Sequence, residues 1–267
     1  MWGAIIGDLA GSIYEYNQTK KISQVKCQKI IEDNAFFSDD TILTMAILEA
    51  VLTNKDYTYY LKKYGKAFLN YKPHFSPYFK SSFSPGFIKW LNGNYIGSST
   101  GNGALMRISP ICYLFENEND ILINTLLATY PSHNSKEAIE CAQKLATIIY
   151  YARKGLRKDL ILQKLNITIN EKQFNKFNKF NTTCYETLDN CIYASFVSNT
   201  FEDAIRKILL YGGDTDTNAC ITGQIAEALY GIDNGLIEQA EKFLPQEFVM
   251  KLEYAYGKRK KCNDIKC

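Results

Sequence analysis

Zinc-site spacing, long apolar runs and an excess of charge are all missing from this 267-residue sequence. None of its eight cysteines forms a C-x-x-C pair, and neither of its two histidines, His74 and His133, stands at zinc-site spacing from a cysteine. A zinc site is therefore disfavoured. No run of about 18 apolar residues occurs, so we expect no membrane-spanning helix. The N-terminal segment lacks a basic region and Asp8 interrupts its apolar run, which disfavours a signal peptide and favours a reducing, cytoplasmic setting.

The charge of the chain is close to balance. Lysine and arginine number 31 against 28 aspartate and glutamate residues, a net charge of +3. No long basic stripe is present, so nothing in the sequence indicates sequence-specific binding of nucleic acid. The exception is a short basic run at residues 258–261. We expect residues 258–267 to form a basic, disordered tail, because charged termini are commonly frayed and solvated.

Signals for β-strands are scarce, whereas several segments have the period of α-helices. The sequence shows no sustained alternation of apolar and polar residues and no Asn-Gly turn between β-branched runs. Ser38 or Asp39 is expected to cap the first predicted helix, Ser135 the second, and Gly231 is expected to end the fourth. The predicted helices cover residues 41–52, 136–153, 201–210, 218–230 and stretches of 238–256 around Pro245.

No composition shift or internal repeat divides the chain. We therefore predict an all-α protein, a compact orthogonal helical bundle, with residues 1–257 as a single domain. Two stretches are less regular. Residues 72–103 contain several prolines and glycines, which is typical of a functional loop, and residues 166–183, rich in Asn, Lys and Phe, are expected to form an exposed connection.

Two short acidic segments are the most informative part of the sequence. They read SDDT at residues 38–41 and GGDTDT at residues 212–217, and each precedes an apolar, helix-like run. Four carboxylates brought together would repel one another unless positive charge lay between them. Oxygen ligands are those that Mg²⁺ and related divalent ions prefer. The segments therefore predict a metal centre built from distant parts of the chain.

Other interpretations of these segments are weaker. An EF-hand loop needs glycine at its sixth position and glutamate at its twelfth, where this chain has Ala219 and Ile225. The aspartate turn of haloacid-dehalogenase-type phosphatases follows a buried strand, whereas two glycines precede the second segment here. The D-D-x-x-D cluster of isoprenoid synthases would need an acid at Leu43. Simple capping of the following helices stays open for both segments.

Two further segments contain polar residues in unusual places. Residues 3–15 have glycines at 3, 7 and 11, which permits close helix packing but leaves Asp8 and Glu15 unexplained. Residues 98–107, SSTGNGALMR, contain a Gly-Asn-Gly turn that could expose backbone amides to an anion or be an ordinary turn. Arg107 could bind a phosphate or pair with an acid inside the fold. His133 could be structural or functional.

Five segments together resemble the ADP-ribosylglycohydrolase family. They read GAIIGDLAGSIYE from residue 3, SDDT from 38, GNGALMR from 101, SHNS from 132 and GGDTDTNA from 212. The resemblance extends from Gly3 to about Gly231. It implies an all-α fold with a binuclear centre of two Mg²⁺ or Mn²⁺ ions in a central cleft.

The resemblance also implies roles for individual residues. Asp216 would bridge the two ions, and Glu15 would lie near the second ion. The implied metal ligands are Glu15, Ser38, Asp39, Asp40, Asp214, Asp216 and Thr217. The implied contacts to the phosphates and distal ribose of ADP-ribose are Ser99, Thr100, Gly101, Asn102 and Gly103. His133 would also contact the substrate. Ser38 replaces a commoner threonine and keeps the hydroxyl.

The implied activity is metal-dependent hydrolysis of the glycosidic bond between ADP-ribose and an acceptor on a protein or small conjugate, which reverses ADP-ribosylation. Glu15 or Asp39 would accept a proton or stabilise positive charge at the anomeric carbon. Thr100 stands where some members have an aromatic that stacks on the substrate, and Phe83 or Phe87 could substitute. The alternative is a non-catalytic ADP-ribose-binding or structural protein on the same fold. In either case we expect a monomer.

Overall fold

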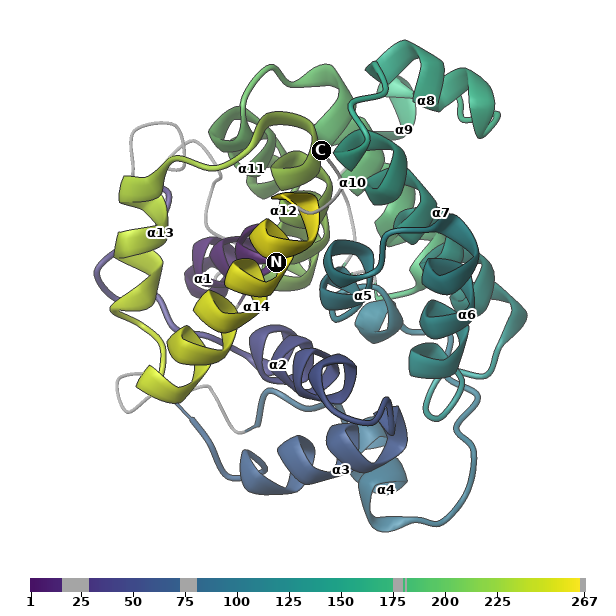
Figure 1. The fold of residues 1–267 in the computed structure, drawn as a ribbon, viewed down its shortest axis with the longest axis vertical. Helices are drawn as coiled ribbons and strands as arrows, with labels where there is room; N and C mark the ends of the chain where they lie inside the picture. The colour runs from purple at the N-terminus through teal and green to yellow at the C-terminus, as the bar shows by residue number, and fades with distance from the viewer. Residues whose placement is uncertain (16–28, 73–80, 175–179, 181, 265–267) are drawn as a thin grey trace.

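Helices account for the regular structure of the computed structural model, which describes residues 1–15, 29–72, 81–174, 180 and 182–264 (Figure 1). Within these residues the chain forms no β-sheet, only isolated bridges between Ser98 and His133 and between Gly101 and Thr183. The all-α prediction is therefore confirmed. The helices are, in chain order, α1 (Trp2–Glu15), α2 (Asp39–Leu52), α3 (Tyr57–Ala67), α4 (Pro85–Asn92), the 3-10 turn η2 (Asn102–Ala104), α5 (Ser109–Leu114), α6 (Glu118–Thr129), α7 (Lys136–Arg153), α8 (Lys158–Lys164), α9 (Glu171–Phe174), α10 (Cys184–Val197), α11 (Phe201–Tyr211), α12 (Thr215–Tyr230), α13 (Asn234–Glu241) and α14 (Gln246–Asp264).

The predicted helices agree with this order and differ mainly at their first residues. The predicted helix over 136–153 coincides with α7, whereas α2 and α12 begin earlier than predicted, at Asp39 and Thr215. Both acidic segments therefore enter the first turns of helices. Ser38 caps α2 by accepting the N–H of Asp40, and Gly231 ends α12 with a φ of 74°, the left-handed conformation that favours glycine.

Helices α1 and α12 pack against each other near the middle of the molecule (Figure 1). The glycines of α1 allow this contact. A Cβ on Gly7 would lie 2.1 Å from the carbonyl oxygen of Ala219, and a Cβ on Gly11 would lie 2.2 Å from that of Thr215. The hydroxyl of Thr215 also donates to the carbonyl oxygen of Gly11 at 2.8 Å. The predicted close packing of the glycine-spaced helix is confirmed, and it places Asp8 beside the start of α12.

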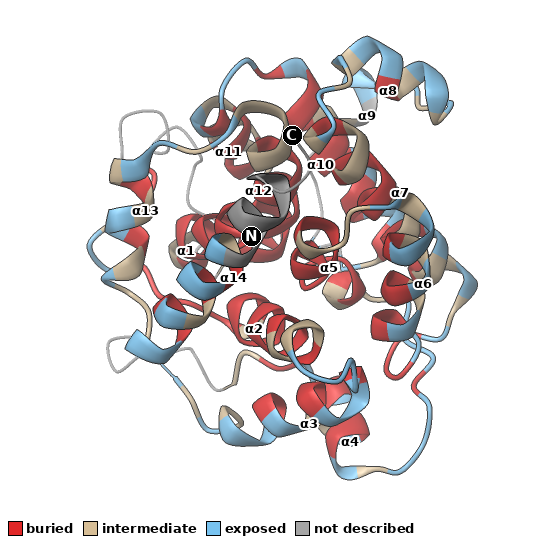
Figure 2. Ribbon diagram, viewed as in Figure 1, coloured by how far each residue is buried: buried red, intermediate tan, exposed pale blue. Residues whose placement is uncertain are grey.

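Helix α2 is the other buried helix next to the acidic segments. Its sequence is apolar on nearly every side, which predicts burial all round, and most of its residues are buried (Figure 2). The helices at the rim of the molecule, such as α3 and α13, are buried only on the faces that point inward. The buried start of α2 therefore lies within the core of the protein.

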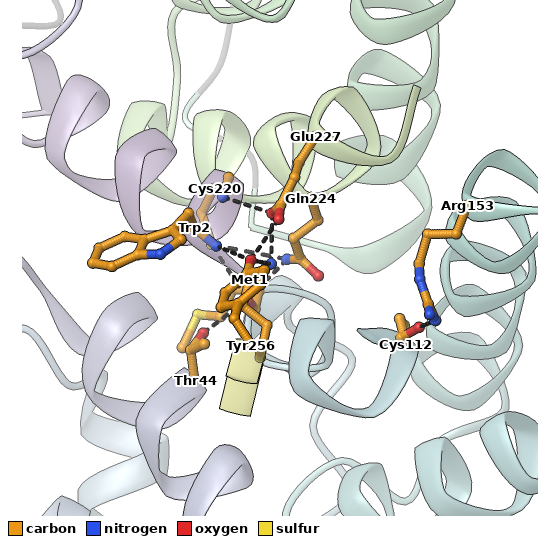
Figure 3. A network of polar contacts seen from close by, with 11 residues as sticks. Met1, Trp2, Thr44, Cys112, Arg153, Cys220, Gln224, Glu227 and Tyr256 are labelled. Carbon is orange, nitrogen blue, oxygen red and sulfur yellow. Dashed lines mark hydrogen bonds and ion pairs between the residues drawn. The ribbon is translucent and has the colours of Figure 1, made fainter. Parts of the chain in front are cut away.

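A polar network joins α1, α12 and α14 at the opposite end of the α1–α12 pair (Figure 3). The amine of Met1 donates to Oε2 of Glu227 at 2.5 Å and to the hydroxyl of Tyr256 at 2.8 Å. The Tyr256 hydroxyl in turn donates to Oε1 of Glu227 at 2.6 Å, and the N–H of Gly3 donates to Oε2 of the same carboxylate at 2.8 Å. These contacts hold the first turn of α1 against the last turns of α12.

Two predictions about less regular segments need revision. The stretch 72–103 contains helix α4, which begins at Pro85 after the cap Ser84. The backbone of residues 258–264, expected to be a disordered tail, forms the last turns of α14, and residues 265–267 lie outside the described residues. Among the residues that the structure describes, no helix has both the length and the apolar character needed to cross a membrane.

Candidate active site

Carboxylates from α1, α2 and α12 converge at the buried junction of these helices. Oxygen atoms of Asp8, Asp40 and Asp216 lie within 4.8 Å of one another, and so do those of Glu15, Asp214 and Asp216. Asp216 belongs to both groups. The predicted meeting of the two acidic segments is therefore observed, and Glu15 lies with the second of them.

Asp8 explains why the first acidic segment lies where it does. Its carboxylate accepts hydrogen bonds from the backbone N–H groups of Ser38 and Thr41, at 2.9 and 3.1 Å, and from their hydroxyls, at 2.8 and 2.5 Å. These four bonds fix the first turn of α2 against α1. Asp8 is not among the predicted site residues, although its position among apolar residues in the sequence is a signal for it.

Asp40 has an oxygen atom without a partner. Its Oδ2 accepts from the hydroxyls of Thr217, at 3.1 Å, and Ser38, at 3.3 Å. Its Oδ1 is buried and has no hydrogen-bond partner within the described structure. An unpartnered buried acceptor is costly unless something positive binds it. The predicted ligands Ser38, Asp40 and Thr217 therefore lie together around an acceptor that a cation would satisfy.

Asp214 does more than occupy the cap position of α12. Its side chain makes no capping bond to that helix; its Oδ2 accepts from Nδ2 of Asn102 at 2.7 Å. Gly212 and Gly213, just before it, have φ values of 81° and 77°, which explains the double glycine. The interpretation of Asp214 as a simple helix cap is thus wrong, because its carboxylate links the acidic segment to the loop at 98–107.

Burial and mutual repulsion raise the pKa values of these carboxyl groups. The pKa of Asp8 rises from 3.8 to about 7, chiefly because the group is buried and secondly because of the charge on Asp216. The same two causes, in the same order, raise the pKa values of Asp39, Asp40 and Asp214 well above the usual range. In the absence of cations these carboxyl groups resist ionisation. Their oxygen atoms are ligands that suit hard divalent ions such as Mg²⁺ or Mn²⁺.

A pocket of about 400 Å³ opens over this cluster. Ser38, Asp40 and Asp8 are not among the residues that line it, and Thr100 is also absent from its wall. Asp39 lines the pocket but belongs to neither group of converging carboxylates. The predicted site residues that line the pocket are Glu15, Asp39, Ser99, Gly101, Asn102, Gly103, His133, Asp214, Asp216 and Thr217.

The loop at 98–103 is held from both sides by segments distant in sequence. On one side the N–H of Ser99 donates to the carbonyl oxygen of Ser132, next to His133, at 3.4 Å. On the other side the N–H of Asn102 donates to the carbonyl oxygen of Thr182 at 2.7 Å. The N–H of Gly101 donates to the hydroxyl of Ser99 at 3.0 Å. The amides of Ser99, Gly101 and Asn102 therefore donate within the protein, which leaves fewer amides of this loop for an anion than the sequence predicts.

The pocket contains both aromatic residues that the sequence suggests, Phe83 and Phe87, and a third, Phe180. Phe83 and Phe87 line it but are only 3% and 9% exposed, and their rings stack with centroids 5.2 Å apart. Phe180 also lines the pocket and is 47% exposed. It comes from the stretch 166–183, which was expected to be a mere connection. Nothing in the sequence near Phe180 indicated this position.

Comparison with known proteins identifies the family of the chain and a solved structure with the same fold. A profile described as ADP-ribosylglycohydrolase matches residues 1–262. The ADP-ribosylarginine hydrolase Tri1 of Pseudomonas putida (strain GB-1) is 28% identical over 177 residues, 62% of this chain and 47% of that protein. The ADP-ribosylhydrolase ARH3 of Bos taurus is 22% identical over 310 residues, 86% of this chain and 84% of that protein.

The fold has a solved counterpart. A structure described as an ADP-ribosylglycohydrolase-related protein complex superposes with a TM-score of 0.68 at 21% identity, covering 94% of this chain and 92% of the other. The match to the Pseudomonas relative spans about half of that protein's length, 47%. The family profile, by contrast, extends over nearly all of this chain, which therefore belongs to the ADP-ribosylglycohydrolase family.

Proposed function

We propose that this protein is a divalent-metal-dependent hydrolase that cleaves the glycosidic bond between ADP-ribose and an acceptor. One observation carries the proposal. Two groups of carboxylates share Asp216, and the group of Glu15, Asp214 and Asp216 lines a pocket whose wall includes residues of the loop at 98–103. Family membership and the hydrolase activities of the relatives named above support the same reaction class.

The carboxylate groups suit two Mg²⁺ or Mn²⁺ ions. Asp40, Ser38 and Thr217 would hold one ion, Glu15 and Asp214 the other, and Asp216 would contact both. Asp8 has four internal hydrogen-bond donors on its oxygens, so its main task would be to orient α2. Bound divalent ions would supply positive charge that activates water and orients ribose hydroxyls.

Other residues would bind the substrate and move protons. Asp39 and Glu15 line the pocket, and each could accept a proton or stabilise positive charge that develops at the anomeric carbon. Burial, and secondly the charge on Asp216, raise the pKa of Asp39 well above its usual range, which favours proton binding by this carboxyl group. Ser99 and Gly103, which line the pocket, would face the diphosphate, with Asn102 held in place by Asp214.

The test is a release assay on a small panel of substrates. Purified protein is incubated with ADP-ribosylated arginine, serine and nucleic-acid conjugates, in Mg²⁺, in Mn²⁺ and in chelator. Metal-dependent release of ADP-ribose supports the proposal and names the acceptor. If ADP-ribose binds but no conjugate is cleaved, the protein is the non-catalytic binder that the fold also permits. If ADP-ribose does not bind, the proposed function is wrong.

A further inference from the structure

Three buried polar side chains form a hydrogen-bonded row beside the loop at 98–103: Arg107, Ser132 and His133. Arg107 is fully buried, and its Nη2 donates to the hydroxyl of Ser132 at 2.8 Å and to the carbonyl oxygen of Ala128 at 3.1 Å. The Oγ of Ser132 lies 2.8 Å from Nδ1 of His133. Ser132 and His133 are themselves only 4% and 7% exposed. Arg107 and His133 lie at the wall of the pocket, whereas Ser132 does not line it.

Counting protons along this row settles the direction of each bond. A guanidinium only donates, so Ser132 must accept from Arg107. The hydroxyl of Ser132 has one proton of its own, and within the described part of the chain its acceptor at hydrogen-bond distance is Nδ1 of His133. If Nδ1 carried a proton instead, the buried hydroxyl proton of Ser132 would have no acceptor, which is unfavourable. Nδ1 is therefore unprotonated, and the neutral ring carries its proton on Nε2.

We propose that Arg107 and Ser132 are positioning residues that hold His133 in its neutral Nε2–H tautomer, so that the ring presents a fixed N–H donor to an oxygen of the bound substrate. This rests on the proposed function for the identity of the substrate, an ADP-ribose conjugate. The oxygen would belong to its diphosphate or to the adjoining ribose.

The position of Nε2 fits this role. A Cβ placed on Gly103 would lie 3.4 Å from Nε2 of His133, and one placed on Gly101 would lie 3.8 Å from it. The Nε2 edge of the ring therefore lies next to the two glycines of the loop, which have no side chains to cover it. His133 and both glycines line the pocket, so an oxygen lying on the loop would come within reach of the Nε2–H.

The charge of Arg107 supports the neutral state. Burial lowers the pKa of Arg107 to about 10, which still leaves it charged at neutral pH. No ion pair of Arg107 is found in the described part of the chain, and its Nε and Nη1 are buried without partners there. Burial first, and the Arg107 charge second, hold the pKa of His133 well below its usual range. The ring would thus remain a neutral donor.

The tautomer can be measured directly, because the chain has only two histidines. The substitution His74→Gln leaves His133 as the single histidine, and long-range ¹H–¹⁵N correlation spectra of ¹⁵N-labelled protein then report both ring nitrogens. We expect a pyridine-type Nδ1 and a pyrrole-type Nε2 at neutral pH. A pyrrole-type Nδ1, or two pyrrole-type nitrogens as in imidazolium, would overturn the proposal.

Ser132→Ala tests the positioning, with Ser198→Ala as the matched control. Ser198 is also a fully buried serine; its hydroxyl donates to the carbonyl oxygen of Ala194 at 2.7 Å, and it does not line the pocket. We expect Ser132→Ala to mix the two tautomers and to weaken ADP-ribose binding about three- to tenfold, the effect of one lost hydrogen bond. Ser132→Thr, which keeps the hydroxyl, should restore the single tautomer, and Ser198→Ala should leave tautomer and affinity unchanged.

The outcomes separate this inference from the proposed function. A single Nε2–H form that persists in Ser132→Ala would show that Ser132 does not set the tautomer. Equal ADP-ribose affinity in wild type and Ser132→Ala would show that the Ser132 hydroxyl does not contribute to substrate binding. If the wild type holds the Nε2–H form and does not bind ADP-ribose, the proposed function fails while the tautomer assignment stands.

Discussion

Asp216 is the residue on which the proposed centre depends most, because it alone belongs to both groups of converging carboxylates. Asp216→Asn keeps the shape of the side chain and removes its charge. We expect at least about a hundredfold loss of metal-dependent release activity and loss of the rise in melting temperature that divalent metal causes. The measurement pairs the release assay with thermal melts in Mg²⁺ and in chelator.

The control for this substitution is Asp189→Asn on α10. Asp189 is 52% exposed at its side chain and lies 3.7 Å from Lys144, a surface ion pair worth little. It should retain both activity and metal response. An Asp216→Asn protein that folds and still responds fully to metal would show that the acidic cluster is not the metal centre.

Phe180 is the exposed aromatic of the pocket and the residue that we expect to stack on adenine. Phe180→Ala should weaken ADP-ribose binding by an amount typical of one base–aromatic stack, about 1–3 kcal/mol. Calorimetric titration of the variant with ADP-ribose measures it. The control is Tyr254→Ala on α14, since Tyr254 is also exposed, at 56%, and lies outside the pocket. Equal affinities for Phe180→Ala and wild type would assign adenine to another part of the pocket.

The chemistry of individual residues predicted part of the candidate site but not the residues whose roles depend on tertiary packing. The acidic residues of the two segments were predictable, because carboxylates and hydroxyls at helix starts point to cation binding. The roles of Asp8 and Phe180 were not, because each depends on which distant segment packs against it. The link from Asn102 to Asp214 spans 112 positions, and no local pattern encodes it.

Among the secondary-structure elements, the contact of α1 with α12 positions the acidic cluster, and glycine makes that contact possible. In Gly7→Ala, the added Cβ would lie 2.1 Å from a backbone carbonyl oxygen of α12, which cannot move without shifting the helix. We expect a loss of roughly 3 kcal/mol or more in the free energy of unfolding. Urea unfolding followed by circular dichroism measures the change.

Gly86→Ala supplies the comparison within another helix. Gly86 lies in α4, is exposed, and a Cβ there would meet nothing within 4 Å. Replacing it should be neutral or stabilising by about 0.5–1 kcal/mol, because alanine favours helix. If Gly7→Ala cost no more than Gly86→Ala, close approach of α1 and α12 would not be what the glycines provide.

Helix periodicity predicted most of the long helices, since an apolar stripe needs no knowledge of its partner. It failed where packing or turn chemistry decides. Helix α4 lies inside a stretch whose prolines suggested a loop, yet Pro85 stands in its first turn, where proline is tolerated. The earlier starts of α2 and α12 arise from tertiary contacts, because Asp8 holds Ser38 and Thr41 at the start of α2 and Thr215 is bonded to Gly11.

For the whole molecule, the raised pKa of Asp8 predicts how stability depends on pH. The folded protein without metal holds this proton up to about pH 7, whereas the unfolded chain releases it near 3.8. Between these values the folded state binds more protons, so the free energy of unfolding falls as pH rises. We expect the melting temperature of chelator-treated protein to fall from about pH 5 to about pH 8, and the stabilisation by divalent metal to grow over the same interval.

Scanning calorimetry across this range, with chelator and with Mg²⁺ or Mn²⁺, measures both trends. Metal should replace protons in neutralising the cluster, so its effect must increase as the protons leave. Chelator-treated protein that becomes more stable toward pH 8, or a metal effect that is equal at both ends of the range, would contradict the assignment of these carboxylates to one centre.

The hydrogen bond from Thr215 to Gly11 joins residues 204 positions apart, and it has a consequence for biosynthesis. At typical rates of 5–20 residues per second, roughly 10–40 s separate the emergence of α1 from that of its partner α12 at the ribosome. During that interval the glycine face of α1 has nothing to pack against, and the cluster cannot yet assemble. The newly made chain should therefore assemble the cluster only after α12 has emerged, in a single late step that joins α1 to α12.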